Sequence, residues 1–302
     1  KEEGGRDVTK ALARACSHFS QRRYAILTRQ CWLDGGITPS ALDEFHSLCL
    51  RAWGEMKPDV GVYAAMRDVG YARFMYRYGQ VLPLRQKDFF QTKPEYNKVV
   101  GSAPRPFNRM SEEFRVSPIL SQMLQILLED VWQYELGPEV HIGVHPVRVR
   151  NYEEVVRDGR TVTIIHNDAS ATLEGTHVDS TERVAVMMIQ RDNVDDGRGR
   201  TSLYKKECPF GLLRARPEDE KVLSPLRVHE HILRDPFEAI TFADHEFKHD
   251  GDTIQAADPE KMCSRQVLLI MARRPLSVPS PLDDRVIDGY SPRSPPRRRH
   301  QV

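Results

Sequence analysis

The chain has no long apolar run and no paired cysteine motif, and each absence removes a class of protein. No stretch of its 302 residues approaches the roughly 18 consecutive apolar residues that span a bilayer. The charged residues 1–7 contain no apolar signal-peptide core. The five cysteines form no C-x-x-C pair, which favours free thiols over a disulfide framework. We therefore expect a cytoplasmic protein that does not associate with a membrane.

Net charge is also nearly absent. The chain carries +1 overall, yet four arginines stand among the last ten residues. They are Arg293, Arg297, Arg298 and Arg299. Without them the rest of the chain is slightly acidic, which is no electrostatic footprint for nucleic acid. A small-molecule partner is the expectation that remains.

The first half of the sequence has helical periodicity. Apolar residues recur at three- and four-residue spacing over 7–19, 39–56 and 117–135, which predicts three helices. Thr38 or Ser40 can cap the second of them. Between the helices, the aromatic stretch 71–78 looks extended and 82–110 looks irregular.

From residue 140 onward, short apolar stretches separated by Asp-Gly turns predict strands. They lie near 140–151, 161–166, 183–190, 200–204, 226–233, 238–244 and 265–272. Short strands without long helices between them are typical of an antiparallel jelly roll. We therefore predict an α+β protein with a double-stranded β-helix, cupin-like core. The predicted parts are a helical N-terminal layer (1–136), the core (137–274) and a Pro/Arg-rich C-terminal strap (275–302).

The segment Glu174-Gly175-Thr176-His177-Val178-Asp179 places an imidazole and a carboxylate two positions apart. On an extended strand both side chains project from one face, because strand side chains alternate with period two. A histidine from a distant strand, for which we take His249, completes three ligands on one side of a metal ion. Such a set leaves the opposite positions open, as in non-haem Fe(II) oxygenases.

A second copy of the pattern, His166-Asn167-Asp168, competes with this pair. It is followed by a loop of small residues, which indicates a strand end exposed to water. His177 and Asp179 instead lead into the apolar strand 184–189, whose mouth can hold ligands rigidly. We therefore prefer the pair His177 and Asp179.

Other histidines also compete, His229 and His231 with the His-x-Asp pair and His245 with the third ligand. His229 and His231 share a strand face but have no accompanying carboxylate at the next alternate position. His245 is the direct rival of His249. We prefer His249, because it precedes an Asp-Gly turn and so lies at the edge of a hairpin, where a ligand can face inward.

Arg265 opens the last apolar strand, 265–272, at a distance from His249 that allows it to return across the barrel. A lone arginine at the start of a core strand is commonly a surface residue with a buried stem. Here its guanidinium can also hold a dicarboxylate through two parallel hydrogen bonds, which a lysine cannot match.

Together these residues resemble the Fe(II)/2-oxoglutarate dioxygenase family that includes the bacterial isoleucine hydroxylases acting on free amino acids. The likeness is best from 144 to 271. The matching segments are His145-Pro146-Val147-Arg148-Val149, Glu174 to Asp179, Asn193 to Tyr204, Asp235-Pro236, His249 and Arg265-Gln266-Val267-Leu268. A fainter likeness includes Tyr96-Asn97 and Arg105-Pro106-Phe107.

The chain departs from the family pattern at several positions outside the metal set. Ser180 and Asp250 stand where the family has glycine, and the Gly-Gly turn is loosened to Asp-Gly-Arg-Gly at 196–199. An insertion carries residues 153–170. These departures bear on which substrate is used rather than on which cofactor.

The resemblance implies a cofactor, a co-substrate and an oxidant, namely Fe(II), 2-oxoglutarate and O2. The implied iron ligands are His177, Asp179 and His249. Arg265 is implied to pair with the distal carboxylate of 2-oxoglutarate, helped by the hydroxyl of Tyr204 or Ser202. The co-substrate is expected to leave as succinate and CO2.

A free aliphatic amino acid needs counterparts for both of its charges. Glu174 is our candidate for the ammonium group, and Arg148 or Arg105 for the carboxylate. Ile240 and Phe242 alternate on one strand, so their face can contact an aliphatic side chain. Plainer roles are a solvated Glu174, an internal ion pair for Arg148 and ordinary core positions for the two apolar residues.

The outcome of oxidation and two other classes of function stay open at this point. Hydroxylation is the usual result in the family, and ring closure, such as aziridine formation from a valine-like substrate, is the variant. The alternatives are an oxygenase acting on a protein or another small molecule, and a non-catalytic metal-binding jelly roll. A hydrolase is disfavoured, because no G-x-S-x-G elbow is present.

Overall fold

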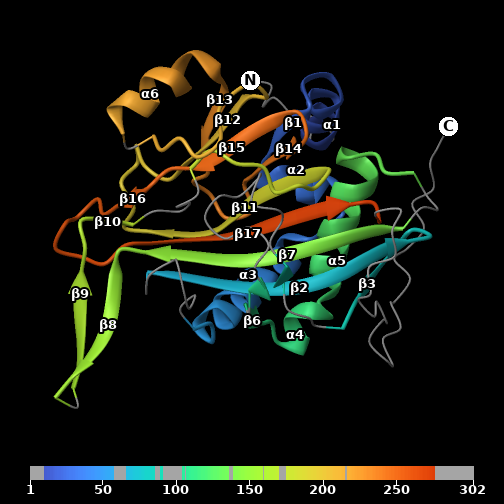
Figure 1. Ribbon diagram of the computed structural model, residues 1–302. Helices are drawn as coiled ribbons and strands as arrows, with labels where there is room; N and C mark the ends of the chain where they lie inside the picture. Colours follow the sequence, from blue (N-terminus) through green and yellow to red (C-terminus); the bar gives the residue numbers. More distant parts are fainter. Residues whose placement is uncertain are drawn as a thin grey trace, which may run out of the picture.

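A large antiparallel sheet forms the centre of the protein (Figure 1). The computed structural model describes residues 10–57, 66–85, 89–90, 104–105, 107–135, 139–158, 160–169, 175–214 and 216–275. The strand order is β1-β14-β11-β17-β7-β2-β3, and the short β6 lies parallel to β2. The bounds are β1 Tyr24–Leu27, β2 Arg67–Arg77, β3 Gln80–Pro83, β6 Asn108–Arg109, β7 Val140–Arg150, β11 Arg183–Asp192, β14 Ala239–Ala243 and β17 Ser264–Arg273.

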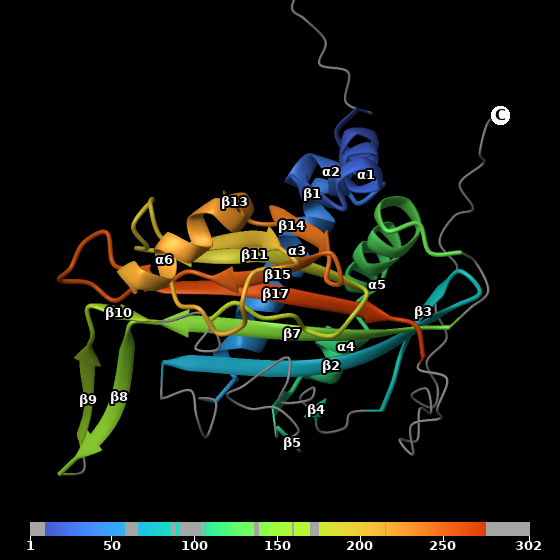
Figure 2. The same ribbon diagram turned by 45° about the horizontal axis from the view of Figure 1, so that its top comes forward.

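Smaller sheets lie over one face of the large sheet, which we call its inner face (Figure 2). One contains β13 (Arg227–Ile232), β12 (Arg200–Lys205) and β15 (Phe247–Gly251) in that order. The other pairs β10 (Asp168–Ala169) with β16 (Ile254–Gln255). Apolar side chains from both layers form one core, in which valines of β7 and β11 meet Leu203 and Ile254. The predicted α+β jelly roll is confirmed.

Helices cover the outer face of the large sheet. They are α1 (Lys10–Arg22), α2 (Arg29–Asp34), α3 (Pro39–Gly54), α4 (Glu112–Arg115) and α5 (Pro118–Gln125), the last continuing as a π-helical turn, Ile126–Val131. Thr38 caps α3, as its side chain accepts a hydrogen bond from the Ala41 N–H. Trp53 on α3 is fully buried and donates to the Val147 carbonyl at 3.3 Å. The apolar stripe read from the sequence therefore faces the sheet.

The N-terminal part contributes strands as well as helices, because β1 and β2 pair within the large sheet. The inserted segment forms a hairpin of β8 (Tyr152–Arg157) and β9 (Arg160–Ile165) that projects from the body (Figure 1). The remaining elements are short: β4 (Phe89–Phe90), β5 (Pro104–Arg105), α6 (Pro217–Leu223) and the 3-10 turn Ser224–Leu226.

All five cysteines are free thiols, and four of them are buried. Among the helices of the described residues, none has the length and apolar character needed to cross a bilayer.

Candidate metal centre

Backbone hydrogen bonds hold the two predicted histidine ligands side by side. His249 lies in the middle of β15, and His177 forms an isolated antiparallel bridge with it. Each backbone N–H donates to the other residue's carbonyl at 3.0 Å. Residues directly opposite each other in such a pair point to the same face. The sequence suggested a hairpin edge for His249, whereas the structure fixes it on both sides, between Leu203 of β12 and His177.

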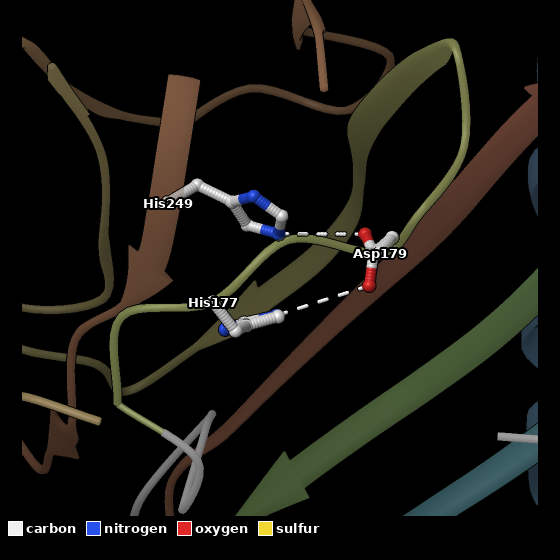
Figure 3. A group of neighbouring side chains, drawn as sticks. All are labelled: His177, Asp179 and His249. Atoms are coloured by element: carbon white, nitrogen blue, oxygen red, sulfur yellow. Dashed lines mark ion pairs between the residues drawn. The ribbon is translucent and has the colours of Figure 1, made fainter. Parts of the chain in front are cut away.

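Asp179 completes the set (Figure 3). Its Oδ1 lies 3.8 Å from Nε2 of His177, and its Oδ2 lies 3.4 Å from Nε2 of His249. One ligand atom from each residue falls within 4.8 Å of the others, and both histidines are buried. Within the described ranges these are the three residues grouped closely enough to hold a metal ion.

Groups outside the metal set orient its three ligand side chains. Nδ1 of His177 lies 2.8 Å from the Gly175 carbonyl, which only accepts, so Nδ1 carries the proton and Nε2 keeps its lone pair. Asp244 is buried and lies with Oδ1 3.6 Å from Nδ1 of His249. Its carboxylate also accepts from the backbone N–H groups of Asp179 at 3.1 Å and Thr181 at 2.9 Å. Such outer partners set ligand orientation. Sequence reasoning missed Asp244, because nothing in its spacing separates it from a turn aspartate.

The turn between Asp179 and Thr181 is strained. Ser180, one of the departures from the family pattern, has φ +58°, a region that favours glycine. A side chain there costs about 1–2 kcal/mol. The two hydrogen bonds to Asp244 lie on either side of Ser180 and hold the turn in place.

The electrostatics prepare two of the three ligands for a cation. Burial, with the neighbouring His249, lowers the pKa of His177 to about 4, so this imidazole is neutral. Burial opposes ionisation of Asp179, but His249 and His177 together lower its pKa to about 2. Burial also acts to lower the pKa of His249, yet the charges of Asp179 and Asp244 raise it above its ordinary value. His249 therefore has to lose a proton when a metal binds.

Metal affinity is expected to fall as the pH falls through the raised pKa of His249. Below that pKa the imidazolium must release one proton before Nε2 can bind, so affinity drops about tenfold per pH unit. Above it the affinity levels off, because the imidazole is already neutral. Mn(II) titration by calorimetry over a pH series, in buffers of different ionisation enthalpy, measures both the slope and the proton released. A flat profile without proton release would contradict the expectation.

Arg265 lies on the inner face with its charge only partly compensated. The side chain is buried, and its Nε and Nη2 have no hydrogen-bond partner among the described residues. Burial and the neighbouring Arg191 lower its pKa to about 10, and Asp252 offsets only part of this effect. A buried charge without a partner costs several kcal/mol (~3–5). An anionic ligand such as a carboxylate therefore fits this position.

The structure does not bring Ser202 and Tyr204 to the same place. Leu203 pairs with His249 and belongs to the inner core, so its neighbours on β12 point to the opposite face. There both hydroxyls accept from Arg214, which also pairs with Glu230 at 3.0 Å. The expectation that they assist Arg265 is therefore wrong. Sequence reasoning missed Arg214, for which no local signal exists.

Arg148 is also directed away from the metal set. It pairs with Gln266 across β7 and β17, on the outer face of the sheet. Its Nε donates to Asp68, which is fully buried and also pairs with Arg150. The assignment of Arg148 to a substrate carboxylate is wrong, because its charge is matched by an internal ion pair.

The other predicted substrate residues are distributed between the inner face and segments outside the described part. Ile240 and Phe242 are fully buried in the inner core, and the Phe242 ring lies 4.8 Å from that of His249. Glu174 lies outside the described residues. Arg105 falls in β5, and its side chain is likewise outside the description.

The rival histidines lie elsewhere and have other partners. His166 lies 3.3 Å from Glu153 at the base of the β8–β9 hairpin, and Asp168 is exposed. His245 is half exposed beside Glu246. His231 is 2.8 Å from Glu238, and His229 stacks on Tyr24.

A loop packs tightly against the segment that carries His177. The Thr176 N–H donates to the Leu212 carbonyl at 3.0 Å, and the Gly211 N–H returns a bond to Thr176 at 2.9 Å. Gly175 has φ +66°, and a Cβ there would lie 2.4 Å from the Leu212 oxygen. Only glycine fits where two backbones approach this closely.

Gly175→Ala is expected to lower the free energy of unfolding by about 3 kcal/mol, because it combines an unfavourable φ with a backbone clash. Metal affinity should fall too, since the clash displaces the neighbouring His177. Gly54→Ala is the matched control. A Cβ at Gly54, the last residue of α3, meets no atom of the described residues within 4 Å, so this change should cost nothing. Urea denaturation measures both, and equal stability of the two variants would refute the argument.

Sequence comparison places most of the chain within one family pattern. The sequence model of the 2OG-Fe dioxygenase family matches residues 51–271, which include the metal set and Arg265. The bifunctional enzyme flvA of Aspergillus flavus is 20% identical over 191 residues, 63% of this chain and 22% of that protein. The chain thus spans about a fifth of that relative's length.

Several solved structures share the fold. A bsmA homologue from Methylobium petroleophilum PM1 has a TM-score of 0.66 at 20% identity, covering 87% of this chain and 93% of that one. The Fe(II)/(alpha)ketoglutarate-dependent dioxygenase TqaL has a TM-score of 0.61 at 14% identity, with 89% of each chain covered. IDO from Bacillus thuringiensis has a TM-score of 0.58 at 13% identity, covering 91% and 98%.

Proposed function

From the premise that the chain belongs to the 2OG-Fe dioxygenase family, we propose that it oxidises an unactivated C–H bond of a free aliphatic amino acid. The protein is an Fe(II)/2-oxoglutarate-dependent dioxygenase. The proposal concerns its substrate, the residues that bind it and the product.

The donor set fits the cofactor and co-substrate. Two imidazoles and a carboxylate suit Fe(II) and, lying on one side, leave positions open. The partnerless N–H groups of Arg265 suit the distal carboxylate of 2-oxoglutarate. When bound, Fe(II) and 2-oxoglutarate supply O2 activation, with succinate and CO2 as co-products. The residues of the chain hold these groups, exclude water and position the target carbon.

The observation that carries the proposed substrate class is an apolar wall that begins at a metal ligand. Phe242 packs on the His249 ring, and Ile240 follows it on the same face of β14. An aliphatic side chain lying on this wall would present its C–H bonds to the metal set. Glu174 remains our candidate for the ammonium group and Arg105 a candidate for the carboxylate. The free thiols favour a reducing compartment such as the cytoplasm.

A screen of aliphatic amino acids tests the proposal. Wild-type protein with Fe(II), 2-oxoglutarate and O2 is expected to release succinate in step with consumption of one such amino acid. Mass spectrometry then distinguishes the gain of one oxygen, for hydroxylation, from the loss of two hydrogens, for ring closure such as aziridine formation. His249→Ala is the control for metal dependence. Succinate release that no aliphatic amino acid stimulates would refute the substrate class and leave the family assignment intact.

A further inference from the structure

Arg67 lies on the inner face, two strands from Arg265. It pairs with Val149 across β2 and β7, and Val149 pairs with Arg265 across β7 and β17. Directly opposite residues of antiparallel strands share a face, and Val149 belongs to the inner core. All three side chains therefore point inward. Neighbouring strands are about 4.8 Å apart, so the Cα atoms of the two arginines lie about 10 Å apart.

The Arg67 charge acts on the metal set. It is one of the causes, after burial and His249, that lower the pKa of His177. Farther along the same two strands, His145 stands on the inner face, and its charge helps to lower the pKa of Asp179. The metal set thus faces a stretch of wall that runs from Arg67 to His145.

The wall between these two residues is apolar. Val69 follows Arg67 at the next inward position of β2, and its partner on β7 is Val147. Both valines are buried in the inner core, with 2% and 7% of their surface exposed. The inner face therefore offers a cation whose charge acts on His177, next to an aliphatic surface on the same two strands.

We propose that Arg67 binds the carboxylate of the amino acid substrate, beside the apolar surface of Val69 and Val147. The inference rests on the proposed function and assigns the subsite that Arg148 cannot form. A guanidinium holds a carboxylate through two parallel hydrogen bonds. Two carboxylate ligands, the co-substrate and the amino acid, repel each other unless each has its own cation. Arg265 and Arg67 lie in the same row of the sheet, with their Cα atoms about 10 Å apart. Arg265 can therefore neutralise the co-substrate, and Arg67 the amino acid.

Binding of L-valine and of isobutylamine, which is valine without its carboxylate, tests this assignment. Each is titrated anaerobically into the Fe(II)–2-oxoglutarate complex, and the shift of the visible charge-transfer band reports affinity without turnover. Arg67→Met is expected to weaken L-valine binding about a hundredfold and to leave isobutylamine binding unchanged. Arg67→Lys keeps the charge and should lose less. Arg77→Met, at the exposed end of the same strand, is the control and should match wild type.

Each outcome decides a different claim. If Arg67→Met binds L-valine like wild type, or weakens both compounds equally, the inference is overturned. The same holds if Arg105→Met is the variant that loses L-valine selectively. If the wild-type protein shows the band but binds neither L-valine nor L-isoleucine, both the proposed substrate class and the Arg67 subsite are refuted. If the wild-type protein shows no charge-transfer band, the proposed function itself is refuted.

Discussion

Asp179→Ala is expected to abolish both metal binding and the consumption of 2-oxoglutarate. The carboxylate lies between the two histidine Nε2 atoms and provides the anionic charge of the ligand set. Removal of a residue that only orients a ligand lowers metal affinity roughly 10–100-fold. Removal of the ligand Asp179 itself should lower metal affinity by more than this. Anaerobic Fe(II) titration and succinate release measure the two effects separately.

Asp168→Ala is the matched control for that experiment. Asp168 belongs to the other His-x-Asp segment and is exposed on β10, so the variant should bind metal and release succinate like wild type. If Asp179→Ala retained metal binding, or if Asp168→Ala lost it, the assignment of the metal set would have to be abandoned.

Arg265→Met is expected to change stability and ligand binding in opposite directions. Without ligand the variant should be about 1–3 kcal/mol more stable than wild type, because a buried charge lacking partners is replaced by an apolar chain. Its affinity for 2-oxoglutarate should fall about a hundredfold or more, because the anion loses its buried cation. Urea denaturation and calorimetric titration with 2-oxoglutarate measure the two quantities.

Arg273→Met controls for the loss of a positive charge from the same strand. Arg273 lies at the exposed end of β17 and should leave both quantities unchanged. A destabilised Arg265→Met that still binds 2-oxoglutarate would show that the guanidinium has a structural role instead. If Arg265→Met were more stable than wild type but bound 2-oxoglutarate equally well, the burial of the charge would be shown to be destabilising. Arg265 would then not be part of the 2-oxoglutarate site.

The fold could be predicted to the extent that it follows from local periodicity. The helix over 39–56 was readable because apolar residues recur at helical spacing and Thr38 caps it, as the structure shows. Strands β11 and β17 were readable because each contains a nearly continuous apolar stretch, and β7 because its apolar residues recur at alternate positions. Strand β15, which carries His249, was not, because its residues Phe247–Gly251 are mostly polar and owe their extended form to pairing with β12.

Prediction of the metal set from the sequence required the least information about contacts between distant residues. Two of its members stand two positions apart in the sequence, so their proximity is nearly a property of the backbone. The third, His249, required a choice among several histidines. The structure brings it to His177 through a bridge between segments 72 residues apart in sequence. Asp244, which supports both Asp179 and His249, became visible only in three dimensions.

By itself the sequence determined the helix and strand periodicities, the His-x-Asp pair and the arginine that opens the last strand, since each is a pattern of near neighbours. Tertiary structure alone decided which polar and charged side chains face the metal set. A shift of one residue turns a strand side chain to the other face, so Ser202, Tyr204 and Arg148 point away while Arg67 points inward. The partner that neutralises Arg148, Asp68, is 80 residues distant in the chain, and no local pattern reaches that far.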